Sequence, residues 1–212
     1  DFWSHRKIEP ASYEAFFFRG AGVNPCVFDT PLGRIGVAIC FDSSKTHTLK
    51  ALIDGGAQIV LVLYSCPSLP GFVPRIVRDN WDSSYRMTAD IYQRVLLAPV
   101  VSCNKTGVVE TPLPLVPLYR ARMEFLSGSS ILNYDGTLIG TLETGSGVLT
   151  GEVRLGDCRC MEASRQLIPT GRWMPQYGVA VRAIADFTHL FGRLRYSLSW
   201  MRRRAARVTA AR

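Results

Sequence analysis

The sequence predicts an α/β protein in which helices cover sheets, and three observations support this. Residues 58–65 (QIVLVLYS) and 99–104 (PVVSCN) are continuously apolar and rich in β-branched residues, as is typical of strands buried on both faces. Residues 80–98 have helical spacing and separate these two runs. Hairpin patterns at 26–41 and 127–142 flank this core. Strands alternating with helices indicate a layered arrangement.

The N-terminal half begins with two short β-prone runs, residues 26–30 and 35–41, and PLGR between them predicts a hairpin turn. Residues 46–57 follow with helical spacing and end in a Gly-Gly stop before the first buried strand.

The C-terminal half contains a hairpin at 127–142 around an Asp-Gly turn, and a further strand is predicted at 147–155. The proline-rich residues 111–123 are predicted to form a loop. The composition changes near residues 172–178, which divides the chain into a domain at 1–172 and a basic helical extension at 173–212.

Composition and charge narrow the function classes. The 212 residues are 47% hydrophobic and 20% charged, as in an ordinary globular protein, and neither a membrane span nor a signal peptide is recognisable. Residues 178–212 hold eight arginines against Asp186, so they carry most of the net charge of +8. The body is nearly neutral, so no nucleic-acid partner is expected. A cytoplasmic location is predicted.

Six cysteines are scattered through the chain and are interpreted as reduced thiols. Cys158 and Cys160 have CxC spacing, but no second Cys or His pair completes a zinc set. Free thiols are therefore predicted, and neither a metal nor a cofactor is expected.

Cys40 stands where an apolar β-run meets the polar start of the next helix. The amides of such a turn favour a thiolate over a thiol. A cysteine at the end of a strand is nevertheless more often a structural residue than a nucleophile. Cys40 alone therefore leaves both interpretations open.

Six short patterns around Cys40 occur in a characteristic order. They are HRK (5–7), YEAFFFRG (13–20), TPLGRIGVAICFD (30–42), GGAQIVLV (55–62), CNKTG (103–107) and FLSGSSILNYDG (125–136). With them the chain resembles the nitrilase, or carbon–nitrogen hydrolase, superfamily over most of residues 1–155. The resemblance implies an α-β-β-α layered sandwich and covalent hydrolysis of a C–N bond in a small amide-type substrate.

The resemblance also implies roles for individual residues. Cys40 falls on the nucleophile, Lys7 on the lysine that stabilises the oxyanion, and Glu14 on a glutamate that holds this lysine and the substrate. The amide of Phe41 would be the second oxyanion donor. Substrate contacts are expected from Phe41, Asp42, His47 and Cys66.

Two departures from the family pattern stand out. The family's general base is a glutamate upstream of the lysine, and this chain begins six residues before Lys7, so an N-terminal segment is expected to be missing. General-base catalysis is worth about 10²–10⁴ in rate, so this polypeptide alone is expected to be impaired. After Cys40, the residues Lys45, Thr46 and His47 replace an aromatic-proline-acid segment beside the substrate, so unusual specificity or a degenerate site is predicted. For His47, a solvated residue at the start of a helix is favoured over a Cys–His dyad.

An a/d seam runs through the basic extension at three- and four-residue spacing. It consists of Ala180, Ile184, Phe187, Phe191, Leu194, Leu198 and Met201. The seam is expected to bury against the body, another subunit or a membrane surface. Packing in a homodimer or higher homo-oligomer is favoured, and a peripheral membrane contact through 178–212 is the alternative. Gly192 within the seam weakens the helix by about 1 kcal/mol relative to alanine.

The predicted function is hydrolysis of a non-peptide C–N bond, in an amide or N-carbamoyl substrate, through a cysteine thioester. The CFD motif at Cys40 is more similar to the amidase and carbamoylase branches than to nitrilases proper. Two alternatives remain open: an inactive binding or assembly subunit, and a membrane-associated N-acyltransferase that uses the same cysteine.

Overall fold

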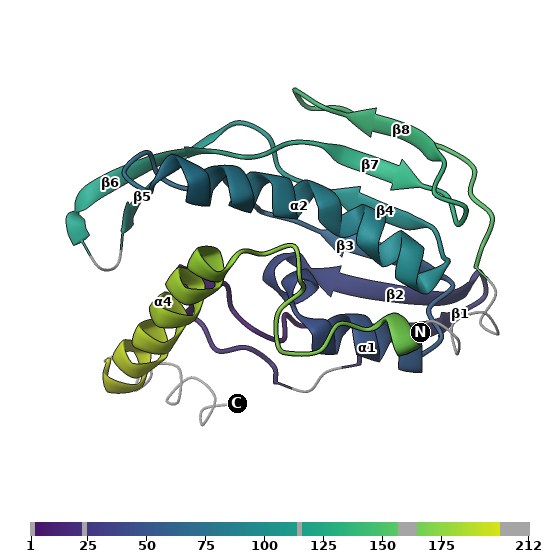
Figure 1. Ribbon diagram of the computed structural model, residues 1–212, viewed down its shortest axis with the longest axis horizontal. Coiled ribbons are helices and arrows are strands. Elements are labelled where there is room, and N and C mark those ends of the chain that lie inside the picture. Colours follow the sequence, from purple (N-terminus) through teal and green to yellow (C-terminus); the bar gives the residue numbers. More distant parts are fainter. Residues whose placement is uncertain (1–2, 23–24, 114–115, 157–164, 200–212) are drawn as a thin grey trace.

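The computed structural model describes residues 3–22, 25–113, 116–156 and 165–199. Its main sheet has six strands in the order β1-β2-β3-β4-β7-β8 (Figure 1). They are β1 Val27–Thr30, β2 Gly33–Ile39, β3 Ile59–Leu63, β4 Val100–Cys103, β7 Ser129–Leu132 and β8 Leu138–Leu142. The central strands β2, β3 and β4 are parallel, whereas β1, β7 and β8 pair antiparallel with their neighbours. The predicted α/β class is confirmed.

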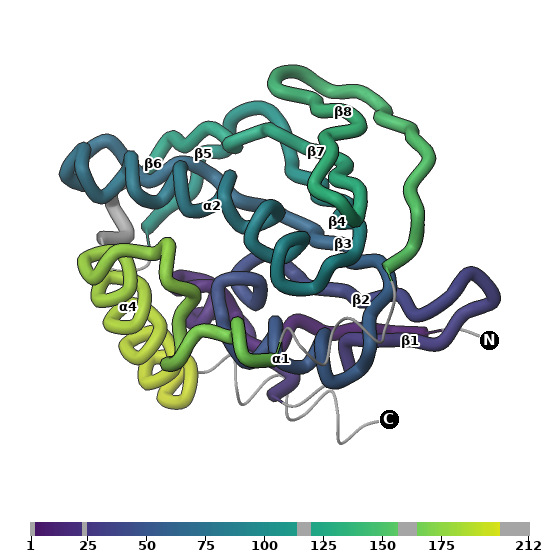
Figure 2. Tube along the Cα trace, turned by 45° about the vertical axis from the view of Figure 1, so that its right-hand side comes forward, coloured from purple at the N-terminus to yellow at the C-terminus, as the bar shows by residue number. Residues whose placement is uncertain are grey.

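Two helices, α1 (Thr46–Asp54) and α2 (Arg75–Leu96), contact each other and the central strands (Figure 2). Val60, Val62 and Val100 alternate with less buried neighbours along β3 and β4 and are fully buried in the core with these helices. Leu63, at the end of β3, is exposed. The carboxyl ends of β2 and β3 lie side by side in register, and this end of the sheet positions the candidate site.

The proline-rich residues 111–123 do not form the predicted loop. They belong to a two-stranded ribbon of β5 (Val108–Leu113) and β6 (Val116–Glu124), separate from the main sheet. Proline lacks an N–H to donate, so a strand can hold it only at an edge or a bulge. Both strands of a two-stranded ribbon are edges, and the register shifts at Pro112, which explains why the prolines are tolerated.

The strand predicted at 147–155 is absent from the described part of the chain, where residues 147–156 carry no regular structure. Leu149 instead packs on β8: a Cβ added to Gly140 would lie 2.7 Å from Leu149 Cδ1. Leu149 therefore covers part of the sheet, and the segment does not extend the edge of the sheet.

The C-terminal helix α4 (Val179–Leu198) packs against the 3₁₀ helix η1 (Ser12–Phe16) near the N-terminus (Figure 1). Gly192 lies at this contact, where an added Cβ would be 2.8 Å from Phe16 Cδ2. Gly192 thus permits a close approach that alanine would obstruct.

The buried face of α4 differs from the predicted seam. The helix buries Val181, Ala185, His189 and Gly192. The seam residues Ile184, Phe187, Phe191, Leu194 and Leu198 are exposed. Phe191 nevertheless contacts Phe16 of η1, with ring centroids 5.9 Å apart, so part of the seam touches the body. For the rest of the seam, the expectation of a partner subunit or a membrane surface stays a prediction. Met201 and the arginines at 202–204 lie outside the described residues. Among the helices that are described, none combines the length and hydrophobicity that crossing a bilayer requires.

Residues on both sides of the predicted boundary share one core. Trp173, Met174 and Tyr177 are buried in the same cluster as Leu49 of α1 and Val60 of β3. The segment leading into α4 is therefore packed into the α/β layer.

Candidate active site

Cys40 follows the last residue of β2 with a backbone φ of +51°, a conformation that non-glycine residues rarely adopt. The chain turns sharply there from the strand into the 3₁₀ helix η2 (Cys40–Ser44). The half-buried thiol is thereby presented at the carboxyl end of the parallel strands. A sharp turn from strand to helix is a recurrent way of exposing a nucleophile.

The two serines that follow CFD hold this turn. Ser43 Oγ donates to the carbonyl of Cys40 at 2.7 Å, and Ser44 Oγ donates to the carbonyl of Phe41 at the same distance. Hydroxyls that bond to carbonyls three residues earlier stabilise short turns. Ser43 and Ser44 therefore fix the backbone around the thiol.

Lys7 and Glu14 form a partly buried ion pair with Nζ 2.6 Å from Oε2. The same carboxylate oxygen accepts the backbone N–H of Ala11 at 2.7 Å, in the manner of a capping box at the start of η1. The Oε2 atom of Glu14 therefore contacts both the start of η1 and the Lys7 ammonium. A contact between Glu14 and Lys7 is the relationship predicted from the sequence.

Asp42 attaches the Lys7 segment to the Cys40 turn. Its two carboxylate oxygens accept the backbone N–H groups of Ile8 at 2.9 Å and Glu9 at 2.8 Å. Burial raises the pKa of Asp42, and these two N–H groups oppose that shift. Asp42 is fully buried, so it positions the irregular segment that carries Lys7.

Burial raises the pKa of the Cys40 thiol, and the Lys7 ammonium is the largest influence in the opposite direction. The backbone N–H groups of Ser65 and Phe41 also favour the thiolate. Three positive or donating groups therefore surround the sulfur. The same groups could stabilise an oxyanion that forms on an attacked carbonyl.

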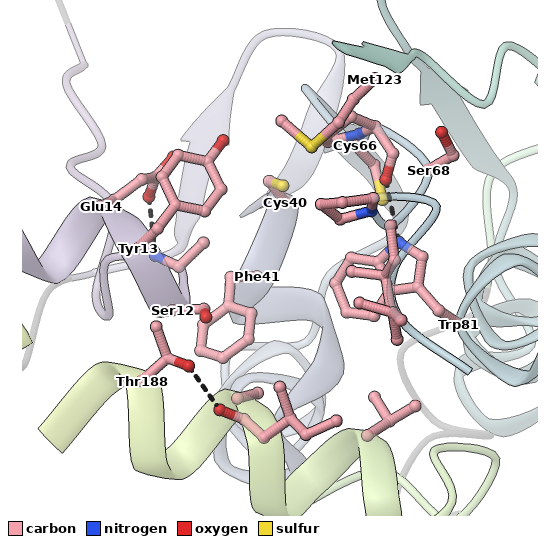
Figure 3. A pocket seen from close by; sticks show the side chains of 18 of the residues that line it. Ser12, Tyr13, Glu14, Cys40, Phe41, Cys66, Ser68, Trp81, Met123 and Thr188 are labelled. Carbon is pink, nitrogen blue, oxygen red and sulfur yellow. Dashed lines mark hydrogen bonds between the residues drawn. The ribbon is translucent and has the colours of Figure 1, made fainter. Parts of the chain in front are cut away.

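A cavity of about 300 Å³ opens at Cys40. The Cys40 sulfur lies within it, with Tyr13 and Glu14 on one side and Cys66 on the other (Figure 3). Phe41 also lines this cavity, so the structure gathers Cys40, Glu14, Phe41 and Cys66 around one space.

Two of the expected substrate contacts lie elsewhere. Asp42 is fully buried and does not line the cavity among the residues described. His47 is exposed on α1 and faces a second, larger cavity with Arg172 and Arg193, which does not contain Cys40. The structure therefore does not bring His47 to Cys40, because the first turn of α1 points away from the thiol.

Two residues of the site were not anticipated from the sequence. Tyr13 lines the cavity, and burial, followed by the Glu14 charge, raises its pKa to about 12, so its hydroxyl remains a donor. Ser65 follows β3 and supplies a backbone N–H to the thiol. Ser65 could have been identified from its place just after a predicted buried strand, because the carboxyl ends of adjacent parallel strands lie side by side.

Lys45 is fully buried behind the site, although it was expected beside the substrate. Its Nζ lies 3.0 Å from the Trp173 ring centroid and 4.3 Å from that of Phe41. Burial lowers the pKa of Lys45 to about 7 against the pull of Glu9. The backbone at Lys45 also bridges to Trp173. Lys45 thus links the Cys40 turn to the segment before α4.

The cysteines that the structure describes are free thiols, as predicted: Cys26, Cys40, Cys66 and Cys103. Cys158 and Cys160 lie outside the described residues. Within the described part, no group of three or more His, Cys, Asp or Glu side chains is placed to hold a metal ion.

A family model described as carbon–nitrogen hydrolase matches residues 3–162, more than half of the chain. This chain belongs to the carbon–nitrogen hydrolase family. The resemblance inferred from the six sequence patterns is confirmed.

Relatives within the carbon–nitrogen hydrolase family include both amidases and nitrilases. An N-carbamoylputrescine amidase of Arabidopsis thaliana is 29% identical over 110 residues, covering 51% of this chain and 36% of that protein. A bifunctional nitrilase/nitrile hydratase of Nicotiana tabacum is 28% identical over 154 residues, covering 72% and 40%. The chain therefore spans well under half the length of these relatives.

The fold is similar to a solved carbon–nitrogen hydrolase from Helicobacter pylori G27. The TM-score is 0.54 at 15% identity, with 73% of this chain and 50% of the other covered. The described sheet and its covering helices therefore have the nitrilase-type fold, in agreement with the predicted layered class.

Proposed function

We propose that Cys40 is the nucleophile of an amide-hydrolysing site in this family member. One observation carries the proposal: Cys40, with a backbone φ of +51°, is presented beside the ion pair of Lys7 and Glu14. Cysteine is already partly ionised near neutral pH and is intrinsically nucleophilic, which suits attack on a carbonyl carbon.

The proposed reaction has two covalent steps. Cys40 Sγ bonds to the amide carbon, and the oxygen becomes an oxyanion near Lys7 and the Phe41 N–H. The C–N bond then breaks, and the amine leaves with a proton equivalent to the one that the Cys40 thiol lost, so a thioester remains. Water adds to the thioester and releases a carboxylic acid and the thiol. Glu14 orients Lys7 throughout, because its carboxylate is fixed by two hydrogen bonds.

The test uses the full-length protein and simple aliphatic amides. Cys40→Ser should abolish ammonia release, and acid-quenched wild-type protein should carry an acyl group on the Cys40 peptide by mass spectrometry. Cys103→Ser is the matched control, because Cys103 is a free thiol exposed at the end of β4. Ammonia release that survives in Cys40→Ser would contradict the proposal.

A further inference from the structure

The Cys40 cavity has two chemically different ends. Its polar end holds Cys40, Tyr13 and Glu14 (Figure 3). Its other walls come mainly from the loop before α2, from α2, from α4 and from the β5–β6 ribbon. They are lined by Leu69, Phe72, Val73, Val77, Val181 and Ile184.

Two of the polar side chains on these walls already donate their hydrogen to backbone carbonyls. Thr188 Oγ1 donates to the carbonyl of Ile184 at 2.7 Å, and Trp81 Nε1 donates to the carbonyl of Pro67 at 3.0 Å. Glu14 is the one charged residue among the described residues that line the cavity, and its carboxylate is bound to Lys7. A charged substrate group would therefore find no oppositely charged side chain among the described residues of these walls.

We infer that the substrate is an amide with an uncharged, apolar acyl group that lies against α4 and the start of α2. This inference rests on the proposed function, because it assigns the occupant of the same cavity. The carbonyl carbon lies at Cys40, and the hydrocarbon portion extends toward Ile184 and Phe72. A cavity of about 300 Å³ holds a small acyl chain.

The wall contributed by α4 makes this specificity a property of the C-terminal part of the chain. Val181 is buried and Ile184 is exposed at the mouth of the cavity, one turn apart on the helix. The helix predicted to pack against a partner subunit or a membrane surface thus contributes directly to substrate selection.

The test measures acylation of Cys40 by the p-nitrophenyl esters of acetic, hexanoic and succinic acids. In each case Cys40 Sγ bonds to the acyl carbon, the C–O bond breaks, and p-nitrophenolate leaves and is followed by its absorbance. Peptide mass spectrometry locates the acyl group, and each rate is divided by the rate with N-acetylcysteine. Burial of one methylene group should raise the normalised acylation rate by up to about fourfold. The hexanoyl ester should therefore acylate Cys40 about tenfold faster than the acetyl ester or more, and the succinyl ester should react most slowly.

Substitutions in α4 test whether the faster reaction of the hexanoyl ester depends on the cavity wall that α4 forms. Ile184→Asn should lower the ratio of the hexanoyl rate to the acetyl rate and remove most of the hexanoyl advantage. Leu190→Asn is the matched control, because Leu190 is exposed on the same helix and is not among the residues lining this cavity. It should behave as wild type.

The outcomes separate the two proposals. If Cys40 is acylated selectively but hexanoyl and acetyl react equally, or succinyl reacts fastest, the apolar substrate class is overturned and the nucleophile stands. If no ester acylates Cys40 faster than Cys103, the proposed function fails, and the substrate class fails with it.

Discussion

Lys45 Nζ lies 3.0 Å from the centroid of the Trp173 ring, and among the described residues it has no hydrogen-bond partner. A fully buried ammonium normally needs a carboxylate or several acceptors. The aromatic faces of Trp173 and Phe41 replace them here, since a ring quadrupole attracts a cation. They do so incompletely, because burial still lowers the pKa of Lys45 to about 7.

Lys45→Met should stabilise the protein at low pH. The folded-state pKa is about 7 and the unfolded value is 10.5, so the charged lysine costs stability below pH 7. Between pH 7 and 10.5 the unfolded chain binds more protons than the folded one, and wild-type stability therefore rises with pH. The variant should gain about 1–4 kcal/mol at pH 6 and little at pH 10 in urea unfolding.

Lys50→Met is the control for this experiment, because Lys50 is an exposed lysine of α1 whose ion-pair partner among the described residues is Asp54. Its stability relative to wild type should not depend on pH between 6 and 10. An equal effect of Lys45→Met at both pH values would show that packing, and not charge, dominates at this position.

Asp42→Asn should weaken the site more than the fold. An asparagine can accept only one of the two N–H groups, from Ile8 and Glu9, and its own amide would oppose the other. The cost should be about 1–3 kcal/mol, and Lys7 should lose its fixed position. Unfolding and Cys40 acylation rates check both effects. Asp29→Asn, which alters an exposed ion pair with Arg34, should change neither.

Lys7→Met should raise the pKa of Cys40, because the Lys7 ammonium lowers it. The alkylation rate of Cys40 by iodoacetamide follows the thiolate fraction, so its pH profile should move to higher pH. Each pH unit of displacement reduces the rate at neutral pH by about tenfold. An unchanged profile would mean that Lys7 does not act on the sulfur.

Gly192→Val should separate α4 from η1. Its side chain would meet Phe16 and the backbone of Ala15, which lies beside Glu14. Overpacking of this kind costs about 1–3 kcal/mol, and the displaced η1 should slow Cys40 acylation. Arg195→Val, at an exposed position of the same helix, controls for the β-branched residue. A variant with full activity would show that this contact does not position Glu14.

The sequence was sufficient for elements whose pattern is local. The buried strands β3 and β4 have continuous β-branched runs, and β1–β2 and β7–β8 have hairpin turns, so all were predicted. The ribbon of β5 and β6 was missed, because proline argues against a strand unless that strand is an edge. Residues 147–155 were predicted as a strand, because a segment that packs across a sheet shows the same apolar pattern.

The candidate site was predictable where motif residues carry it. Lys7 and Glu14 were predicted as a pair, and they form one at 2.6 Å. Their roles in catalysis stay predictions. The seven-residue spacing between Cys40 and His47 does not predict whether the His47 side chain faces the thiol, because its direction depends on how the chain turns from η2 into α1. The α4 wall was foreseeable only in part, because Ile184 belongs to the seven-residue repeat but the buried Val181 lies outside it.

The pairing of the two ends of the chain has a consequence for synthesis. His189 Nδ1 lies 3.1 Å from the carbonyl of Pro10, a contact that spans 179 positions. Translation delivers η1 well before α4, so the nascent chain carries Cys40 long before the helix that closes its cavity has left the ribosome. The thiol therefore acquires its full surroundings only after nearly all of these residues have been made.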